Sequence, residues 1–256
     1  MRGLTDKVVV VAGGGSGIGA ATACRLGEEG AAVVVGDLDG DAAQAVADEV
    51  RDGGGRALGV QFDIADDHSV GALVAAAVQE FGGVDHLHAN AADLSPENIG
   101  RDSDALTVPL DVFDHTLEVN LRGHLLCTRH VLPLLLGRGG GAIVYTSSAA
   151  GHIGEPERPS YGVSKAGINA IVRHVASRWG REGIRANAVA PGLVVTPRMA
   201  ETVAAEFTQY ALGVGRSPRL GRPDDIAAMV SFLMSDDGEW VNGQVLSVDG
   251  GASMRP

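Results

Sequence analysis

The sequence predicts an α/β fold, with a doubly wound parallel sheet of about seven strands and helices on both faces. Three observations lead to this prediction. Short apolar runs alternate with amphipathic stretches along the whole chain, most of the runs are almost entirely apolar, and a glycine-rich turn follows the first run. A chain of 256 residues without a Pro/Gly/Ser-rich linker or a fixed-period repeat is expected to form a single domain over residues 1–256.

Each expected element follows from its local pattern. Apolar runs of strand length predict strands at 7–12, 32–36, 57–62, 84–89, 141–146, 184–190 and 244–248. Apolar residues at three- and four-residue spacing predict helices at 17–29, 41–51, 66–81, 111–136, 161–181 and 224–234. Asp66 and Asp224 stand where a helix N-cap would be useful.

Three loops are longer than their connections require, at 91–110, 149–160 and 191–222. They follow the fourth, fifth and sixth expected strands. Ligands of open parallel sheets bind outside the carboxyl ends of the strands. We therefore expect these three loops to line a substrate site.

Charge and composition exclude several classes of protein. The 20 basic and 32 acidic residues give a formal net charge of −12, which would repel a nucleic-acid backbone. No apolar run reaches the roughly 18 to 20 residues of a membrane span. The N-terminus lacks the pattern of a secretory signal, and Cys24 and Cys127 fit a reducing compartment, so a cytoplasmic location without nucleic-acid or membrane partners is expected.

The eight histidines raise the question of a metal site. His86 and His88 alternate on an expected strand, but no Cys or acid cluster completes a ligand set around them. We expect no metal. His152, four residues after Ser148, lies in a loop that should face substrate, where it would either contact a polar substrate group or stand in solvent.

A glycine loop joins the first strand to the first helix. Its backbone demands angles that a Cβ penalises, and glycines let a pyrophosphate approach a helix N-terminus closely. By itself the cluster is equally typical of an ordinary strand–helix turn. The loop residues expected to bind the cofactor are Gly13, Gly15, Ser16, Gly17, Ile18 and Gly19.

Asp37 favours the interpretation of this loop as a cofactor site, because it ends the second expected strand 20 residues after Gly17. This is the distance at which an acid meets the adenosine ribose in a dinucleotide-binding fold. A carboxylate accepts from two ribose hydroxyls and repels a 2′-phosphate, so Asp37, followed by Leu38, favours NAD over NADP. The alternative is a turn or cap acid in the segment 37–40.

Ser148, Tyr161 and Lys165 complete a set of motifs by which the chain resembles the short-chain dehydrogenase/reductase family, in its single-domain branch of about 250 residues. The resemblance covers nearly the whole chain. The matching segments are the glycine loop 13–19, 63–64 after strand three, 89–92 after strand four, Asn120 within 118–121, 147–148, 161–165, 191–192 and 248–251. The resemblance implies a Rossmann fold with a nicotinamide cofactor.

The chain also departs from the family pattern. Ala12 stands where the family usually has Thr, and Ala89 and Ala92 replace a usual Asn and Gly. The segment between Asn90 and Asn120 is longer than usual and lies beside the expected substrate site. The substitutions at Ala12, Ala89 and Ala92 affect positions that brace the cofactor loop, and they leave the reactive groups in place.

The resemblance assigns roles to four catalytic residues. Tyr161 would be the general acid/base, and Lys165, four residues later on the same helix face, would lower the pKa of Tyr161 and hold the nicotinamide ribose. Ser148 would orient the substrate oxygen, whereas Ser147 would be an ordinary strand-end serine. Asn120 would hold a water of a proton relay. Taken alone, the Tyr and Lys form a common chance pair, and a mid-helix Asn often binds neighbouring backbone.

The resemblance also places the rest of the cofactor site. Asp63 and Ile64 would lie at the adenine, although Asp63 equally fits a helix-leading acid. Asn90 and Ala91 would lie beside the adenosine ribose. The residues expected at the nicotinamide are Tyr161, Lys165, Pro191, Gly192, Val194 and Thr196.

These expectations describe an NAD-dependent oxidoreductase that interconverts a secondary alcohol and a ketone by hydride transfer, on a small, hydrophobic or cyclic substrate. The alternatives are a catalytically silent NAD-binding regulatory or scaffold protein of the same fold, and an isomerase or dehydratase that retains its cofactor. The resemblance further implies a homotetramer or homodimer formed through helices 111–136 and 161–181 and the C-terminal strand.

Overall fold

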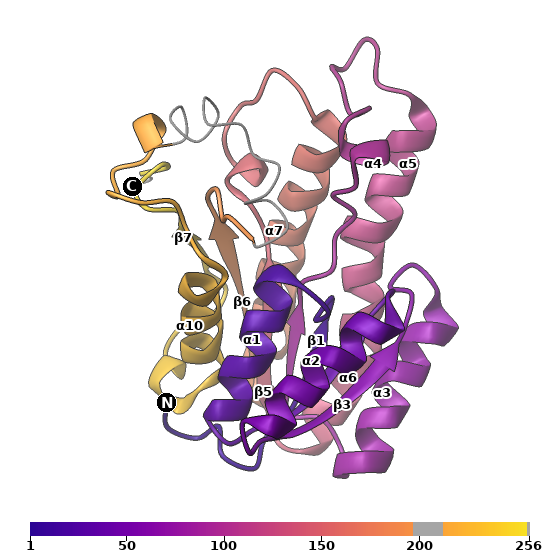
Figure 1. The fold of residues 1–256 in the computed structure, drawn as a ribbon, viewed down its shortest axis with the longest axis vertical. Helices are drawn as coiled ribbons and strands as arrows, with labels where there is room; N and C mark the ends of the chain where they lie inside the picture. The colour runs from indigo at the N-terminus through magenta and orange to yellow at the C-terminus, as the bar shows by residue number, and fades with distance from the viewer. Residues whose placement is uncertain (197–211, 255–256) are drawn as a thin grey trace.

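The computed structural model describes residues 1–196 and 212–254. Within these ranges, parallel strands form one sheet in the order β3-β2-β1-β4-β5-β6-β7 (Figure 1). The strands are β1 (Val8–Ala12), β2 (Ala32–Asp37), β3 (Arg56–Gln61), β4 (His86–Ala89), β5 (Gly141–Thr146), β6 (Ile184–Pro191) and β7 (Val245–Val248). This confirms the predicted doubly wound fold and the number of strands.

The strand order reverses between β1 and β4, because the chain passes from β3 back across β1 to form β4. The two strands are in register, with Ala12 beside Ala89. Just beyond them, the backbone N–H of Ala91 donates to the carbonyl of Ala12 at 2.8 Å. The loops after β1 and β4 therefore start side by side, at the place where open α/β sheets bind their ligands.

Helices cover both faces of the sheet because alternate strand residues point to opposite sides. Val10 of β1 packs with α3 (Asp67–Phe81), α6 (Gly123–Gly137) and α7 (Pro159–Trp179). Val9 and Val11 pack with α1 (Gly17–Glu28), α2 (Gly40–Asp52) and α10 (Pro223–Met234). On the second face, α1 and α10 lie side by side (Figure 1).

One predicted N-cap is confirmed and the other is wrong. Asp66 caps α3, and its carboxylate accepts from the N–H of His68 at 3.0 Å. Asp224 lies inside the first turn of α10, whose N-cap is Arg222 with Pro223 next. Asp225 instead accepts from the Arg222 N–H at 2.8 Å, because Pro at the first helical position starts the helix one residue earlier.

The predicted helix 111–136 is not continuous. The structure has α5 (Leu110–Leu117), a π-helical turn η1 (Glu118–Arg122), and then α6. A π turn inserts one extra residue into the helical repeat and often marks a functional site. Asn120 lies in this turn, which apolar periodicity alone does not distinguish from α-helix.

The described parts of the three long loops lie at the upper end of the molecule in Figure 1. Segment 91–110 contains a short helix, α4 (Pro96–Ile99), and segment 149–160 begins with a 3₁₀ turn, η2 (Ala149–Gly151). In the third loop, Val194 pairs with Gly221, and residues 197–211 lie outside the described residues. Further 3₁₀ turns are η3 (Gly180–Glu182) and η4 (Asp236–Gly238).

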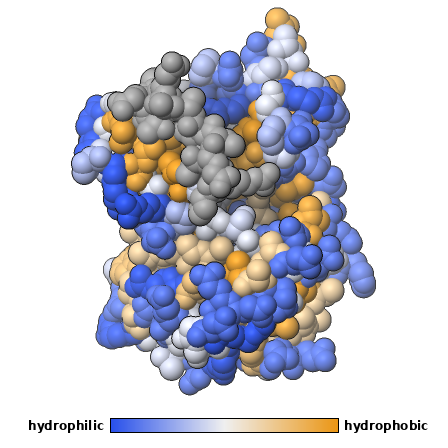
Figure 2. All heavy atoms as spheres, viewed as in Figure 1, coloured by the Kyte–Doolittle hydropathy of each residue, from blue (hydrophilic) through white to orange (hydrophobic). Residues whose placement is uncertain are grey.

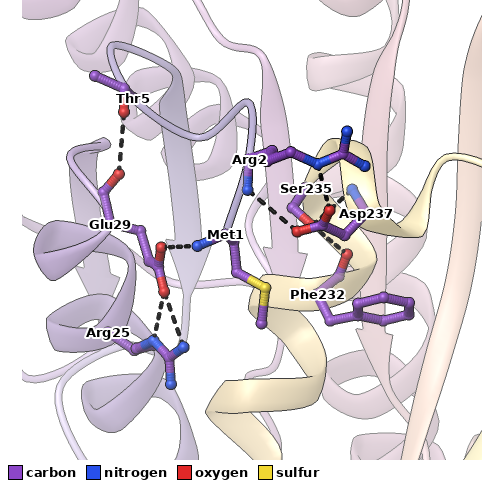
Figure 3. A network of polar contacts seen from close by, with 8 residues as sticks. All are labelled: Met1, Arg2, Thr5, Arg25, Glu29, Phe232, Ser235 and Asp237. Carbon is purple, nitrogen blue, oxygen red and sulfur yellow. Dashed lines mark hydrogen bonds and ion pairs between the residues drawn. The ribbon is translucent and has the colours of Figure 1, made fainter.

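The N-terminal segment joins α1 to η4 (Figure 3). The amino group of Met1 pairs with Glu29, which also accepts from Arg25, and the guanidinium of Arg2 donates to Asp237 at 2.6 Å. These bonds hold the end of the sheet opposite to the three long loops. Among the described helices none is long and apolar enough to cross a bilayer, and Cys24 and Cys127 are both free thiols.

Candidate active site

The residues predicted to be catalytic come together at the carboxyl ends of β4 and β5. Ser148 follows β5, Tyr161 and Lys165 lie on α7, and Asn120 lies on the π turn between α5 and α6. Helix α7 contacts η2, η1 and β6, so the elements that carry these four residues pack against one another. The fold thus assembles residues that are as much as 45 positions apart (165 − 120) in the sequence.

Lys165 is buried, with 1% of its surface exposed. Its ammonium donates to the carbonyl of Thr146 at 2.9 Å and lies 5.5 Å from the centre of the Tyr161 ring. Within the described residues no carboxylate forms an ion pair with it. Burial without such a partner lowers the pKa of Lys165 to about 8, because the charged form loses hydration.

The pKa of Tyr161 is raised above its ordinary value, opposite to the direction expected from the sequence. Burial is the largest cause, since it penalises the phenolate. A hydrogen bond with Ser148 and the charge of Arg158 act in the other direction. The structure therefore holds a neutral phenol beside an ammonium, which is the form that donates a proton, whereas the phenolate is the form that accepts one.

The geometry distinguishes the two adjacent serines. Ser147 is buried and donates to the side-chain oxygen of Asn169 at 2.6 Å, so its hydroxyl serves the packing of α7 on β5. Ser148 begins η2, where its hydroxyl accepts from the N–H of Ala150 at 3.2 Å and bonds with Tyr161. Ser148 is therefore the serine that shares a site with the phenol.

Asn120 is fully buried on the π turn. Its side-chain oxygen accepts from the backbone N–H of Asp93 at 2.9 Å, and its side-chain nitrogen has no partner in the described part of the chain. The bond reaches a segment 27 residues away, so Asn120 ties η1 to the loop after β4 rather than to neighbouring backbone. A buried unpaired donor of this kind fits a bound water.

The glycine loop leaves room for a phosphate-bearing cofactor. Gly13 and Gly17 have φ of +84° and +54°, which favour glycine. A Cβ on Gly19 would lie 1.9 Å from the carbonyl oxygen of Gly13. Ser16, the N-cap of α1, makes no capping bond through its side chain. The first N–H groups of α1 are thus available to an anion at the carboxyl end of β1, as a dinucleotide pyrophosphate requires.

Asp37 lies at the end of β2, directly beside this loop. One carboxylate oxygen accepts from the N–H of Gly15 at 2.8 Å, and the other from the N–H of Asp39 at 3.2 Å. The residue therefore acts as a turn acid, as one interpretation of the sequence has it, and also braces the phosphate loop. Leu38, next to it, is 67% exposed and leaves the adjoining surface uncharged.

A chain of hydrogen bonds connects three strands at their carboxyl ends. The amide of Asn90 donates to the Gly13 carbonyl at 2.8 Å and accepts from the Thr146 hydroxyl at 2.9 Å. The Thr146 hydroxyl also contacts the His88 ring at 3.0 Å. Thr146 and His88 were not among the predicted site residues, although polar side chains on otherwise apolar strands are a signal that could have identified them.

Other residues that are predicted to bind the cofactor lie near the carboxyl ends of β1, β3, β4 and β6. Asp63 accepts from the N–H of Ala65 at 2.8 Å, which is the bond of a turn-forming acid, and Ile64 is 5% exposed. Ala91 packs so closely on Gly13 that a Cβ added to Gly13 would lie 2.5 Å from the Ala91 Cα. Pro191 ends β6, and Gly192, Val194 and Thr196 lie in the segment that follows. The Thr196 methyl lies 3.1 Å from an ideal Cβ on Gly17.

The two histidines of β4 lie in the core of the protein. His86 and His88 are buried, and the pKa of each is lowered to about 3 because burial penalises the charged ring. In the described ranges, no group of three His, Cys, Asp or Glu side chains could hold a metal ion. Both histidine rings are therefore neutral at ordinary pH, which fits hydrogen bonding within the core.

Comparison with known proteins gives a consistent set of matches. The family model described as enoyl-(acyl carrier protein) reductase matches residues 12–253. A probable short-chain type dehydrogenase/reductase of Bradyrhizobium diazoefficiens is 44% identical over 96% of this chain and 86% of its own. The cis-4-hydroxycyclohexanecarboxylate dehydrogenase of Sinomonas cyclohexanicum is 42% identical over 96% of both chains.

A solved structure is similar in fold as well as in sequence. It is a 7α-hydroxysteroid dehydrogenase in complex with NADH and 7-oxo glycochenodeoxycholic acid. The TM-score is 0.90 at 34% identity, over 98% of this chain and 95% of that chain. The likeness thus extends over the sheet and the helices on both of its faces.

Proposed function

The chain belongs to the short-chain dehydrogenase/reductase family, and on this premise we propose an NAD-dependent enzyme that interconverts a secondary alcohol on a hydrophobic or cyclic skeleton and the corresponding ketone. It is an oxidoreductase that acts on CH–OH groups with a nicotinamide cofactor. One observation carries the proposal: Ser148, Tyr161 and Lys165 meet beside a glycine loop suited to a dinucleotide.

In the proposed reaction the protein moves one proton. Tyr161 takes the hydroxyl proton from the alcohol, or returns it to the ketone oxygen, and Ser148 donates a hydrogen bond that orients this oxygen. Lys165 places a positive charge 5.5 Å from the Tyr161 ring and so favours the phenolate, which takes the alcohol proton in the oxidative direction and forms again in the reductive direction. A bound nicotinamide supplies the hydride acceptor or donor.

Asn120 is proposed to hold a water near Lys165, through the side-chain nitrogen that lacks a protein partner in the described residues. Such a water would let the proton taken from substrate leave the buried site. Partial burial of Tyr161 and full burial of Lys165 keep bulk solvent away from the reacting groups. This exclusion strengthens the electrostatic contacts in the site.

The preference for NAD is supported by Asp37. Its carboxylate lies at the loop edge where the ribose of the adenosine half would bind, and a 2′-phosphate there would be repelled. Neighbouring Leu38 offers no positive charge in compensation. The other proposed contacts of the adenosine half are Asn90 and Ala91 at the ribose and Asp63 and Ile64 at the adenine. The proposed contacts of the nicotinamide half are Pro191, Gly192, Val194 and Thr196.

The proposed substrate class is supported by the apolar side chains exposed on the loops. Leu94, Leu106 and Ile153 are 54%, 92% and 45% exposed and belong to the loops that follow β4 and β5, and Leu110, which begins α5, is 75% exposed. Figure 2 shows hydrophobic residues beside the grey atoms in the upper half of the view, whereas blue residues cover much of the lower half. The named relatives act on a hydroxycyclohexane acid and a hydroxysteroid.

Cofactor titration and turnover test this proposal together. We expect NADH to quench or shift the protein fluorescence on binding. NADH should bind more tightly than NADPH, and the Asp37→Ala variant should show a smaller difference between the two affinities. The Tyr161→Phe variant should bind NADH and lose turnover by about 10²- to 10⁴-fold with cyclic secondary alcohols and NAD⁺. Tighter NADPH binding by the original protein would contradict the cofactor preference, and full activity of Tyr161→Phe would contradict the mechanism.

A homodimer or homotetramer is also proposed. A groove between α5–η1–α6 and α7 is lined by Leu117, Leu121, Leu125 and Ile171. Leu125 is 43% exposed, and a second copy of the same helices would cover this face by a two-fold interface. A mass in solution at the monomer value, 26.2 kDa, would contradict this proposal.

We further propose that residues 1–256 form one domain and that the protein works in the cytoplasm. One continuous sheet joins the first strand to the last, which supports a single folding unit. The free thiols of Cys24 and Cys127 suit a reducing compartment. A single cooperative unfolding transition, and recovery of the protein in the cytosolic fraction of its cells, are the expected results.

A further inference from the structure

Asp102 lies in the long segment between β4 and α5, yet it is 4% exposed. Its carboxylate contacts the start of α7, 58 residues further along the chain. One oxygen accepts from the Ser160 hydroxyl at 2.7 Å and from the Ser160 N–H at 3.2 Å, and the other accepts from the Tyr161 N–H at 2.9 Å. All three donors belong to the first turn of the helix that carries the proposed catalytic tyrosine.

Helix α7 has no cap of its own. Its N-cap is Arg158, which has a φ of +63° and makes no capping bond through its side chain. Pro159 follows and has no N–H to donate. The N–H groups of Ser160 and Tyr161 would therefore lack partners within the helix, and Ser160 is fully buried. Asp102 supplies from a distant segment the acceptor that an N-cap side chain usually provides.

The backbone of Asp102 and Ser103 also binds the start of α7. The Arg158 N–H donates to the carbonyls of Asp102 at 3.1 Å and Ser103 at 2.7 Å. The left-handed conformation of Arg158 is thus held by the segment that provides the carboxylate. Side chain and main chain together fix the start of α7 against residues 102–103.

The other end of this segment is attached to the π turn and to α5. The Asp93 N–H donates to the Asn120 side chain, and the Asn98 amide donates to the Thr116 hydroxyl at 3.1 Å. Both Asn98 and Thr116 are buried. Asp102 is therefore carried by a segment fixed on both sides, not by a freely moving loop.

We propose that Asp102 is a positioning residue for the oxidoreductase reaction, which holds the first turn of α7 so that the Tyr161 phenol keeps its place between Ser148 and the ammonium of Lys165. This inference rests on the proposed function. Ser148 is attached to the sheet and Lys165 lies more than one turn into α7, so Tyr161 is the member of the set that fraying of the first turn would move. It also gives the long segment 91–110 a role in the chemistry.

Steady-state kinetics of Asp102→Ala and Asp102→Asn provide the test. A displacement of about 1 Å at a reacting group lowers the rate on the order of 10²-fold, so kcat of Asp102→Ala should fall by about that factor. The amide oxygen of Asp102→Asn still accepts from the helix, so its loss of kcat should be smaller. The affinity for NADH should stay unchanged, because the glycine loop does not touch Asp102. The deuterium isotope effect on kcat should rise as hydride and proton transfer become rate-limiting.

Asp66→Ala is the matched control. Asp66 also caps a helix N-terminus with its carboxylate, but α3 carries none of the proposed catalytic residues. It should lose thermal stability with kcat unchanged. A kcat of Asp102→Ala equal to that of the original protein, an equal loss of kcat in Asp66→Ala, or a parallel loss of NADH affinity in Asp102→Ala would each overturn the positioning role.

Amide hydrogen exchange separates this inference from the proposed function. In Asp102→Ala, exchange at Ser160 and Tyr161 should become faster while the later turns of α7 keep their protection. Unchanged exchange at these two amides would refute the positioning role even in a protein without measurable turnover. An original protein that oxidises none of the alcohols offered would instead count against the proposed function, and the exchange result would still decide the role of Asp102.

Discussion

Replacing Lys165 by Met should make the protein more stable at neutral pH while removing its activity. The ammonium is buried with 1% exposure and without an ion-pair partner in the described residues, so its pKa falls from 10.5 to about 8. This difference corresponds to about 3 kcal/mol of unfavourable free energy in the folded state. Met has a similar length and carries no charge, so it fills the same space without that penalty.

The net gain is smaller than the full penalty. Lys165→Met also loses the hydrogen bond to the Thr146 carbonyl, which contributes about 1 kcal/mol. We therefore expect the free energy of unfolding at pH 7 to rise by about 2 kcal/mol. Stability gained by removing a functional group is the usual exchange between stability and activity at a buried active site.

The pH dependence has a definite sign. A lysine with a lowered folded-state pKa destabilises the protein fully below about pH 8, where both states are protonated. The unfolded chain binds more protons between about pH 8 and pH 10.5, so the penalty disappears as the pH rises through this range. The stability difference between Lys165→Met and the original protein should therefore shrink by about 2 kcal/mol from pH 7 to about pH 9.5.

Urea unfolding of both proteins without cofactor, at pH 7 and at about pH 9.5, measures this difference. Other titrating groups are common to both proteins, so their contributions cancel in the comparison. A difference in unfolding free energy that is the same at both pH values would refute the reasoning that burial of the ammonium destabilises the fold. The variant should bind NADH measurably but oxidise no alcohol.

Three further perturbations have expected outcomes. Gly19→Ala should abolish NADH binding in a fluorescence titration, because its Cβ would lie 1.9 Å from the Gly13 carbonyl oxygen; binding at the original affinity would contradict the proposed phosphate loop. Asp85→Asn should lower the urea unfolding free energy by about 2 kcal/mol, since the Asp85 carboxylate is 9% exposed and accepts from Arg138 at 3.0 Å; the 37% exposure of Arg138 moderates the loss. Leu125→Asp should reduce the mass measured by light scattering, because it places a charge in the proposed interface; a mass equal to that of the original protein would speak against that interface.

Much of the fold was predictable because its signals are local. Apolar runs such as 7–12 and 32–36 became β1 and β2, and the glycine loop became the turn into α1 with Gly13 and Gly17 at positive φ. Asp66 was predictable as a cap because a capping bond joins neighbouring residues. Each of these features depends on a few consecutive residues, whose conformations the side chains themselves restrict.

Local pattern was insufficient where two structures share one periodicity. The π turn at 118–122 keeps the apolar positions of a helix, so 111–136 gave no sign of the interruption around Asn120. The start of α10 depended on Pro223, which moved the cap from Asp224 to Arg222. The pKa of Tyr161 rises because the fold buries the phenol, an effect that four-residue spacing to Lys165 does not contain.

By itself, the sequence determined the α/β class, the family, the pairing of Tyr161 with Lys165 on one helix face, and the glycine turn. Only the tertiary structure decided that Thr146 links His88 to Asn90 at the carboxyl ends of the strands, and that Asp102 caps the helix of Tyr161 from 58 residues away. The physical reason is separation along the chain. Residues three or four apart meet in any helix, whereas distant residues meet only after the sheet has brought the ends of β4, β5 and α7 together.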